Sequence, residues 1–358
     1  MTAWRGLLLA WYASARRDLP WRRTRDPYAV WVSETMLQQT RVDTVVPYFE
    51  RFLRELPTVT SLAEAPAEKV LALWSGLGYY RRARMLHAAA RRVAAAFGGR
   101  IPSEPESLRA LEGVGAYTAG AVASIAFGRP AAVVDGNVAR VLARLFAIED
   151  DVKSTRGRAR LWQLAEGLVP EGGSEGDPGD WNQALMELGA TVCLPRAPRC
   201  GDCPVRAHCA ARKAGAEARL PRVSARGPVR EVARVAVVLA SEREVLLARR
   251  RPDALFGGLW EPPSIESGSG RRDGGLKQLA QWLSLSLGDV ERAGEVTHVL
   301  SHRRLRVTVW RGPLGPKRRY GLPGPEYDAI ERVPVRRLAS LGRSSLAQRI
   351  LALASVTL

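Results

Sequence analysis

Residues 108–120 read Leu-Arg-Ala-Leu-Glu-Gly-Val-Gly-Ala-Tyr-Thr-Ala-Gly, with Gly113 and Gly115 between two segments of helical character. The pattern L-x-G-V-G-x-x-T-A is typical of a hairpin that joins two helices. Because the two glycines carry no side chains, backbone N–H groups of the hairpin could approach a phosphate at the positive end of the following helix. The stretch therefore predicts a helical fold with one surface suited to a nucleic-acid backbone.

The hairpin lies within a long region of helical periodicity. Apolar residues recur at i, i+3 and i+4 spacing from residue 1 to about residue 170, and Gly or Pro marks the short turns between them. The clearest helices are expected at Val42–Leu56, Ala67–Trp74, Ala83–Phe97, Thr118–Phe127 and Val138–Ile148. A Gly-rich loop at 172–179 should lead into a further helix that begins at Asp180 as its N-cap.

All 4 cysteines of the chain are concentrated in residues 193–209, with the spacing C-x6-C-x2-C-x5-C. Disulfides are disfavoured, because in small secreted proteins they join distant segments. A compact set of four thiolates is typical of a [4Fe-4S] cluster, and structural zinc sites more often show paired C-x2-C knuckles. The interpretation is a cluster, with zinc as the alternative and His208 as a further candidate ligand. The predicted ligands are Cys193, Cys200, Cys203 and Cys209.

Composition limits the class of protein. The 358 residues can hold two domains, and 46% hydrophobic with 25% charged residues describe a globular protein. The 54 Lys and Arg residues against 36 Asp and Glu residues give a net charge of +18, which favours a polyanionic partner. An arginine-rich composition alone can also produce such a charge, so the motifs must decide between these interpretations.

No apolar run approaches the length of a membrane span. The apolar run that follows Arg5 resembles a weak signal peptide, but Leu7, Leu8, Trp11 and Tyr12 fit one face of an amphipathic helix. We therefore expect a monomeric, cytoplasmic protein, associated with the nucleoid, that has no membrane partner.

A second domain of α+β type is predicted beyond the cysteines. Alternating strands are expected at Val232–Ala240, Glu244–Arg249, Glu295–Leu300 and Leu305–Trp310, with an amphipathic helix at Leu276–Leu287. The predicted boundaries are a helical domain at 1–211, a basic linker at 212–230 and the second domain at 231–358.

Asp135 follows the hairpin by about twenty residues and stands at the start of another helix. An N-cap is one explanation for it. Together, however, the hairpin, this aspartate and the cysteine run resemble the endonuclease III superfamily of base-excision DNA glycosylases. The motifs Asp18–Arg22, Val30–Thr40 and Leu77–Tyr80 narrow the resemblance to the MutY type. That family implies a two-lobed helical fold that binds double-stranded DNA and removes adenine mispaired with 8-oxoguanine or guanine.

The resemblance assigns the chemistry to two carboxylates. Glu34 lies in an apolar stretch, so burial should raise its pKa and keep a proton available for adenine N7 near neutrality. Asp135 should stabilise the oxocarbenium-like sugar, while Tyr117 and Asn137 orient carboxylate and water. Bifunctional relatives carry a lysine at the position of Tyr117, and a phenol cannot form their Schiff base. The chain is thus expected to be a monofunctional hydrolase.

The resemblance also implies contacts to the flipped base and to the lesion. The residues expected to shape the adenine pocket are Trp21, Arg22, Leu37 and Val42. Those expected beside 8-oxoguanine are Gln39, Thr40, Leu77 and Tyr79. Core packing is the alternative for Leu77 and Tyr79. The residues that could contact phosphates or remain solvated are Arg81, Arg82, Arg84, Arg196 and Arg199.

Residues Phe256–Pro263 resemble part of the MutT-like, Nudix-fold domain attached to these enzymes, without the R-E-x-x-E-E helix that holds Mg²⁺. The domain should therefore bind and not hydrolyse. Ser301 and His302 are expected to read the 8-oxoguanine strand, or else to serve as ordinary turn residues. Leu300 replaces the aromatic residue that is usual in the family, which puts a stacking contribution there in doubt.

Two other functions are considered. A pyrimidine-specific glycosylase/lyase of the same superfamily is disfavoured by Tyr117 and by the Ser33-Glu34-Thr35 motif. A non-catalytic DNA-binding protein that senses redox state through its cluster is disfavoured by the intact pair Glu34 and Asp135. A pure DNA binder has no need of two carboxylates facing an anionic duplex.

Overall fold

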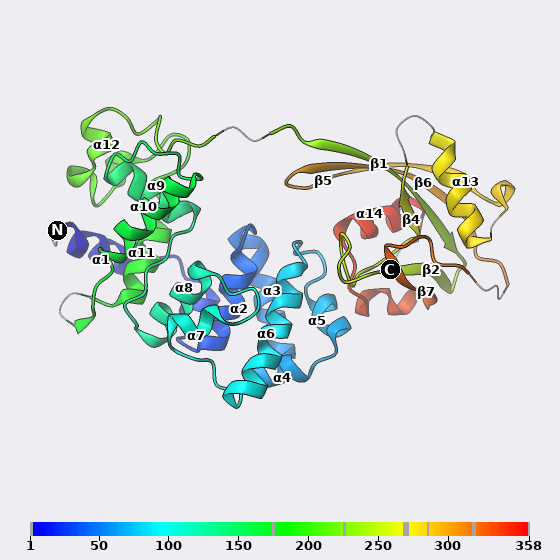
Figure 1. Ribbon diagram of the computed structural model, residues 1–358, viewed down its shortest axis with the longest axis horizontal. Helices are drawn as coiled ribbons and strands as arrows, with labels where there is room; N and C mark the ends of the chain where they lie inside the picture. The colour runs from blue at the N-terminus through cyan, green and yellow to red at the C-terminus, as the bar shows by residue number, and fades with distance from the viewer. Residues whose placement is uncertain are drawn as a thin grey trace. The chain divides into compact units, whose positions relative to one another are not determined.

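The computed structural model describes residues 3–173, 176–224, 227–267, 272–284, 286–316 and 320–356. Contacts divide the chain into two compact units. The first unit comprises Met1–Ala63 and Ala88–Arg226, and the second comprises Glu64–His87 and Gly227–Leu358. Figure 1 shows helices in the first part of the chain and a sheet with helices in the C-terminal part, which confirms the predicted fold class.

The helices of the first part follow one another with short connections. Their bounds are α1 (Ala3–Ala15), α2 (Pro27–Leu37), α3 (Val42–Glu55), α4 (Val59–Glu64), α5 (Ala67–Leu73), α6 (Arg81–Phe97), α7 (Pro105–Arg109), α8 (Ala116–Phe127), α9 (Gly136–Leu145), α10 (Thr155–Glu166), α11 (Pro178–Thr191) and α12 (Ala210–Lys213). The five helices expected from periodicity are all present, with ends that differ by up to three residues. Within the described residues, no helix is long and apolar enough to cross a membrane.

The predicted start of α11 is wrong by one turn. Asp177, and not Asp180, is the N-cap, and its side chain accepts a hydrogen bond from the backbone N–H of Asp180 at 2.8 Å. Pro178 occupies the first helical position, where its missing N–H costs nothing and its fixed φ favours the helix. The Gly-rich loop before this helix is described except for residues 174–175.

The predicted apolar face of α1 also needs correction. The buried side chains are Trp4, Leu8 and Tyr12, which recur every four residues. Leu7 is 48% exposed and lies beside this buried face, not within it. The helix therefore packs through a face that begins one turn earlier than the sequence indicated.

The hairpin between α7 and α8 has the predicted form. Gly113 has φ of 75°, a left-handed conformation that favours glycine, whereas Gly115 is extended and serves as the N-cap of α8. A Cβ atom built on Gly115 would meet nothing within 4 Å. Nothing in the described protein thus requires glycine at 115, and the surface there is open to a ligand.

The described residues of the second unit form a seven-stranded sheet with the order β3-β2-β1-β6-β5, while β4 pairs with β1 and β7 pairs with β2. Strands β1 and β6 are parallel, and the other recorded pairs are antiparallel. The strands are β1 (Arg230–Ala240), β2 (Glu244–Arg250), β3 (Trp260–Glu261), β4 (Ser264–Glu266), β5 (Glu291–Val299), β6 (Arg303–Pro313) and β7 (Tyr327–Pro334).

Both faces of this sheet are covered by helices. Val232, Ala236 and Val238 of β1 belong to a core cluster that includes α14 (Ser345–Leu353). The alternate residues Val235, Val237 and Leu239 pack with α13 (Arg272–Leu283) on the other face. Because side chains alternate along a strand, β1 supplies both cores and reads as a nearly continuous apolar run.

The helix predicted at Leu276–Leu287 ends at Leu283, four residues early. Ser284 has a positive φ of 52°, which stops the helix, and Leu287–Asp289 form a separate 3-10 turn. Strand β7 and helix α14 were not predicted. The buried residues Leu346, Ala347, Ile350 and Leu351 give α14 the spacing of an amphipathic helix, whereas the burial of β7 does not alternate regularly.

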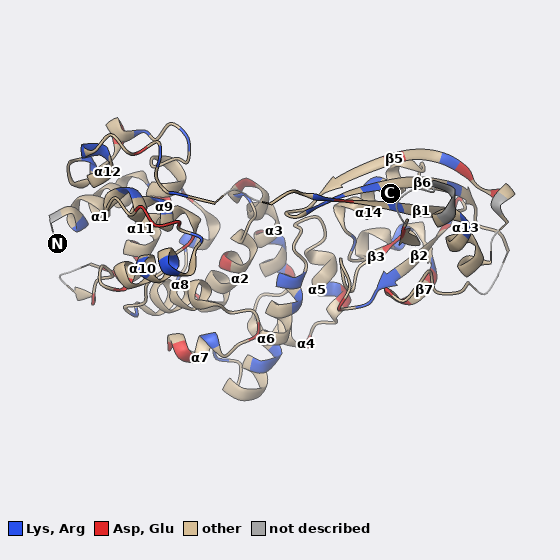
Figure 2. Cartoon of the chain, turned by 45° about the horizontal axis from the view of Figure 1, so that its top comes forward, with Lys and Arg blue, Asp and Glu red and all other residues tan. Residues whose placement is uncertain are grey.

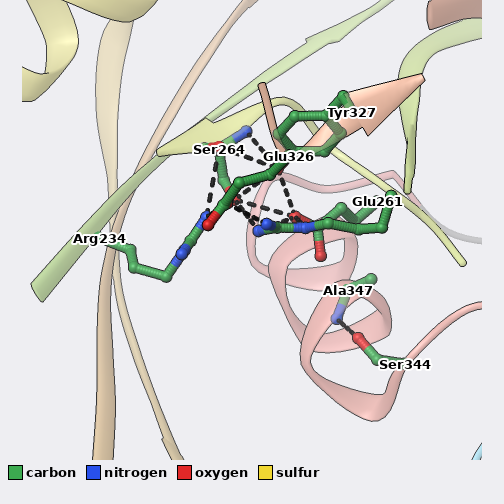
Figure 3. A network of polar contacts seen from close by, with 8 residues as sticks. Arg234, Glu261, Ser264, Glu326, Tyr327, Ser344 and Ala347 are labelled. Atoms are coloured by element: carbon green, nitrogen blue, oxygen red, sulfur yellow. Dashed lines mark hydrogen bonds and ion pairs between the residues drawn. The ribbon is translucent and has the colours of Figure 1, made fainter. Parts of the chain in front are cut away.

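A network of buried charged and polar side chains connects strands β1, β2, β3, β4 and β7 of the second unit (Figure 3). Arg250 is 1% exposed, and its guanidinium donates to Glu261 Oε1 from Nε at 2.9 Å and also pairs with Glu326. Tyr327 donates its hydroxyl to the same Glu261 oxygen at 2.6 Å. Arg234 donates to Glu326 at 3.2 Å and to Ser264. The charges of this network therefore balance one another inside the sheet.

Candidate active site

Glu34 lies on α2 and is 5% exposed. The helix begins at the N-cap Asp26, whose carboxylate accepts from the backbone N–H groups of Tyr28 and Ala29, and Pro27 occupies the first position. Burial raises the pKa of Glu34 to about 7, a nearby negative charge on Asp135 adds to the rise, and Tyr117 and Arg22 oppose it. The carboxyl group is therefore partly protonated at neutral pH, as the sequence predicted.

Tyr117 connects α8 to this carboxyl group. Its hydroxyl donates to Glu34 Oε2 at 2.5 Å and lies 3.3 Å from Met186 Sδ on α11. A phenol has one proton, so the shorter contact takes it, and the thioether acts as a packing neighbour. Burial and the two carboxylates raise the pKa of Tyr117 well above its usual value. The residue therefore remains a phenol and serves as a fixed donor.

Asp135 is the N-cap of α9. This capping role is compatible with the other role expected for the residue, the stabilisation of a cationic sugar. Its Oδ1 accepts from the backbone N–H of Val138 at 2.7 Å, and its Oδ2 accepts from Asn137 Nδ2 at 2.9 Å. Desolvation nevertheless raises its pKa, against the hydrogen bonds from Val138 and Asn137. The negative charge of Asp135 also acts on Glu34, so the two carboxyl groups are coupled electrostatically.

Asn137 is itself fixed from two sides. Arg140 donates to its Oδ1 at 2.9 Å and also binds the carbonyl oxygens of Cys193 at 2.7 Å and Gly189 at 2.8 Å. Gly189 packs so closely that a Cβ atom built there would lie 2.5 Å from Asn137 Cβ. Helices α9 and α11 thus hold the amide that orients Asp135.

Glu187 of α11 supports the residues before α2. Its side chain is 0% exposed and accepts hydrogen bonds from the Arg17 guanidinium at 2.7 and 2.8 Å, from the Arg17 backbone N–H at 3.2 Å and from Arg22 at 2.8 Å. Burial works to raise the pKa of Glu187, but the two guanidinium groups lower it to about 2. Arg22 is thereby held where its charge acts on Glu34.

The other predicted pocket residues surround the end of α2. Trp21 is 5% exposed and packs edge-on against Phe49 with ring centroids 5.4 Å apart. Leu37, Thr40 and Val42 are half-buried, whereas Gln39 is exposed and has a positive φ of 59°. The turn from α2 to α3 therefore presents Gln39 outward from a strained backbone position.

Of the residues expected near the lesion, Gln39 and Thr40 belong to the first unit, whereas Leu77, Tyr79, Ser301 and His302 belong to the second. Tyr79 is 47% exposed with φ of 47°, and its hydroxyl lies 2.8 Å from Ser301 Oγ in the turn between β5 and β6. His302 is exposed beside it. Leu77 is 5% exposed, so in this structure it packs in the interior. Leu300 packs against the core cluster that includes α14.

The basic residues are spread over both units, as Figure 2 shows for α6 and α12 among other elements. Arg82 stacks over the rings of Trp74 and Tyr79, at 5.5 Å from each centroid. Arg84 donates to the carbonyl of Gly257 at 2.6 Å, and Arg199 pairs with Asp202 at 2.7 Å. The exposed predicted phosphate contacts are Arg81, Arg196 and Arg199.

The four cysteines are not in disulfides. The other three thiols act electrostatically on Cys203, whose pKa burial raises to about 11, so they lie near one another. Arg144 of α9, 2% exposed, donates to Cys193 Sγ at 3.3 Å. Among the residues with described positions, no three potential ligands converge closely enough to hold a single ion. Four thiols beside a buried cation are still a donor set that fits an anionic iron–sulfur cluster.

Arg140, Arg144 and Glu187 were missed by the sequence analysis. Charged residues are seldom fully buried, so the apolar periodicity of α9 and α11 assigned these positions to the surface. One signal was present for Glu187, which stands between Met186 and Leu188 as Glu34 stands within its own apolar stretch. In this chain Glu34 and Glu187, each within an apolar helical stretch, are both buried.

Comparisons with known proteins agree with this geometry. The model of the HhH-GPD superfamily base excision DNA repair protein matches residues 32–166, and a NUDIX domain model matches residues 234–353. The chain is 41% identical to the adenine DNA glycosylase of Homo sapiens over 87% of this chain and 67% of the human protein. It is 35% identical to that of Schizosaccharomyces pombe over 86% of this chain and 81% of the yeast protein.

A solved structure of a thermostable thymine-DNA glycosylase is also similar. It is 33% identical, has a TM-score of 0.53, and the match covers 59% of this chain and 95% of that protein. The helical part of the chain therefore has the fold of base-excision DNA glycosylases.

Proposed function

The chain belongs to the adenine DNA glycosylase family of base excision repair, and from this membership we propose that it hydrolyses the N-glycosidic bond of adenine mispaired with 8-oxoguanine or guanine. One observation carries the mechanism. Glu34 is buried with a pKa of about 7, bonded to Tyr117 and electrostatically coupled to Asp135. The site thus holds an acid and an anion together, as glycosidic cleavage requires.

In the proposed reaction, protonated Glu34 gives its proton to adenine N7 as the bond between N9 and C1′ breaks. The bonding electron pair leaves with the base, and Asp135, held by Asn137 and Val138, stabilises the cationic sugar. Water then adds its oxygen to C1′ and returns a proton to Glu34. Tyr117 has no amine to form an imine, so the reaction ends at an abasic site.

Recognition of the opposite base is assigned to the second unit. The contact between Tyr79 and Ser301, with His302 exposed beside it, supports a surface that reads the 8-oxoguanine strand. Gly113 and Gly115 would bind the backbone through their N–H groups, since the hairpin is open at 115. The absence of the R-E-x-x-E-E motif supports binding without nucleotide hydrolysis by the NUDIX-like part.

We further propose that Cys193, Cys200, Cys203 and Cys209 hold a [4Fe-4S] cluster. Arg144 would place a positive charge beside the sulfur ligands of the cluster. Arg140 would connect the cysteine loop to the active site, because it donates to the carbonyl of Cys193 and to Asn137. When bound, the cluster would supply a rigid architecture for the loop. The high positive charge and the DNA substrate support the proposal that the protein is a monomer associated with the nucleoid in the cytoplasm.

The test is single-turnover base release from duplexes that contain A:8-oxoguanine, A:G or thymine glycol, with strands resolved before and after alkali. Release of adenine from the first two duplexes, with strand scission only after alkali, supports the proposal. Scission without alkali would indicate a lyase. Tight binding of A:8-oxoguanine without loss of adenine would instead indicate a lesion-binding protein.

The pH dependence of base release follows from Glu34. Because Glu34 must be protonated and its pKa is about 7, the single-turnover rate should fall about tenfold per pH unit above about 7. On the acid side the rate should also fall as Asp135, whose pKa burial raises, loses its charge. Rates measured from pH 5 to pH 9 on A:8-oxoguanine would check this. A rate that stays level up to pH 9 would contradict the assignment of Glu34 as the acid.

Gly189→Ala is expected to slow base release on the order of 10²-fold, because the new methyl group displaces Asn137 and thereby Asp135. Overpacking should also cost about 1–3 kcal/mol of stability. The matched control is Gly6→Ala on α1, where a Cβ atom meets nothing within 4 Å. Equal single-turnover rates for the two variants would show that Gly189 does not position Asn137.

A further inference from the structure

Arg343 differs from the other buried arginines of the described residues. It is 5% exposed and its Nε is buried without a hydrogen-bond partner. In the part of the chain that the structure describes, its guanidinium has no recorded hydrogen bond or ion pair. The four arginines of comparable burial, each with several partners, are Arg140, Arg144, Arg234 and Arg250.

An unpaired buried cation is costly. Desolvation lowers the pKa of Arg343, and no neighbouring carboxylate is among the causes of that shift. Burying a charge without a partner costs several kcal/mol, so such groups are retained where a ligand completes them. Arg250 of the same unit differs in this respect, because Glu261 and Glu326 balance its charge.

The backbone of Arg343 is fixed to the loop that follows α5. Its carbonyl accepts from Ser75 Oγ at 2.6 Å and from the Tyr80 hydroxyl at 3.1 Å, and its N–H donates to Ser75 Oγ at 3.1 Å. These two residues flank the loop that contains Leu77 and Tyr79. Arg343 is thereby attached to the segment that is expected to face the lesion.

The same place lies at the positive end of a helix. Arg343 directly precedes Ser344, the N-cap of α14, and α14 is nine residues long. Ser344 satisfies one N–H group of the first turn by accepting from Ala347 N at 3.0 Å. The helix dipole favours an anion near the backbone of Arg343, and no carboxylate is among the causes that shift the pKa of its guanidinium.

We propose that Arg343 binds a phosphodiester group of the DNA strand that passes the Ser75–Tyr80 loop. This inference rests on the proposed function, because the duplex supplies the phosphate. Arg343 completes its hydrogen bonds only in the complex, and in the free protein it lowers stability. A guanidinium suits this ligand because it can donate two parallel hydrogen bonds to phosphate oxygens.

The test compares Arg343→Met with Arg311→Met, a matched control that removes an exposed arginine paired with Glu291 at 2.7 Å. Affinity for a duplex is measured from low to moderate salt, with and without an A:8-oxoguanine pair. For Arg343→Met, affinity should fall about tenfold on both duplexes, and the slope of log K against log salt should shrink by about 0.9. Its unfolding midpoint should rise or stay unchanged. The control should match wild type.

Three outcomes would overturn the inference. The first is an unchanged affinity and salt slope for Arg343→Met. The second is a lower unfolding midpoint together with a weaker affinity, which assigns Arg343 to the fold. The third has two parts: inorganic phosphate raises the unfolding midpoint of wild type but not of Arg343→Met, and the slope of log K for duplex against log salt is the same for both proteins. That result would indicate a site for a small free anion.

The inference can fail separately from the proposed function. Wild-type protein that binds duplex but releases no adenine would contradict the proposed reaction. The salt dependence of duplex binding could still be compared between wild type and Arg343→Met. Wild-type protein that releases adenine, with Arg343→Met identical in affinity and slope, would contradict the inference alone.

Discussion

Glu34→Gln should reduce base release from A:8-oxoguanine by a factor of about 10²–10⁴, the usual contribution of a general acid. The amide keeps the size of the side chain and can still accept the Tyr117 hydrogen bond seen at 2.5 Å, but its N–H groups are not acidic enough to protonate adenine. Single-turnover rates at pH 6, where wild-type Glu34 is mostly protonated, would check this.

The same substitution should stabilise the folded protein at alkaline pH. The folded pKa of Glu34 is about 7 against 4.5 for the free group, so the native state binds the proton more tightly than the unfolded state. Its contribution is largest below pH 4.5 and is lost as the pH rises through 7, a difference of about 3 kcal/mol. Glu34→Gln should therefore unfold at higher denaturant than wild type at pH 8, and at a similar concentration at pH 4.

Glu104→Gln is the matched control for both measurements, because Glu104 is half-exposed and pairs with Arg129 at 2.5 Å. It should leave the rate and the pH dependence of stability unchanged. A Glu34→Gln protein that retains wild-type base release would exclude Glu34 as the acid. Equal stability of Glu34→Gln and wild type at pH 8 would exclude the raised pKa.

Glu261→Ala should destabilise the second unit by about 3–5 kcal/mol, the cost of removing one partner from a buried ion pair. Glu261 is 4% exposed and accepts from Arg250, Tyr327 and Ser264, with the Tyr327 bond at 2.6 Å. Its loss leaves Arg250 with Glu326 alone and two hydroxyl groups without this acceptor. Denaturant unfolding followed by a probe in the second unit would measure the change.

The control for this measurement is Glu331→Ala, an exposed carboxylate on β7 of the same sheet. It should change stability by no more than about 0.5 kcal/mol. If Glu261→Ala unfolds at the same denaturant concentration as Glu331→Ala, the network in Figure 3 does not stabilise the sheet.

Sequence alone predicted the features that depend on local patterns. The helices around the hairpin, the burial of Glu34 and the N-cap position of Asp135 all follow from periodicity, apolar neighbours and capping chemistry. The start of α11 was wrong because two aspartates, Asp177 and Asp180, both fit an N-cap. Pro178 was the signal that should have decided between them.

Features that depend on contacts between distant segments could not be predicted in this way. Glu187 meets Arg17 and Arg22 across about 170 residues of sequence, and nothing local indicates such a pairing. The buried Arg250 lies in a strand where charge ordinarily marks the solvent face. The charged α10 and β7 segments likewise owe their place to packing.

The stretch Glu64–His87 belongs to the second unit although it lies between two segments of the first unit in sequence. Leu71 fills the space beside Gly258 and Gly342, so this stretch contributes side chains to the body formed by the C-terminal residues. A deletion from residue 227 onward would therefore remove the packing partners of an internal segment that stays in the chain. A chimera that takes the C-terminal part from a homologue would therefore need residues 64–87 from the same homologue. The structural unit that can be exchanged is discontinuous in sequence.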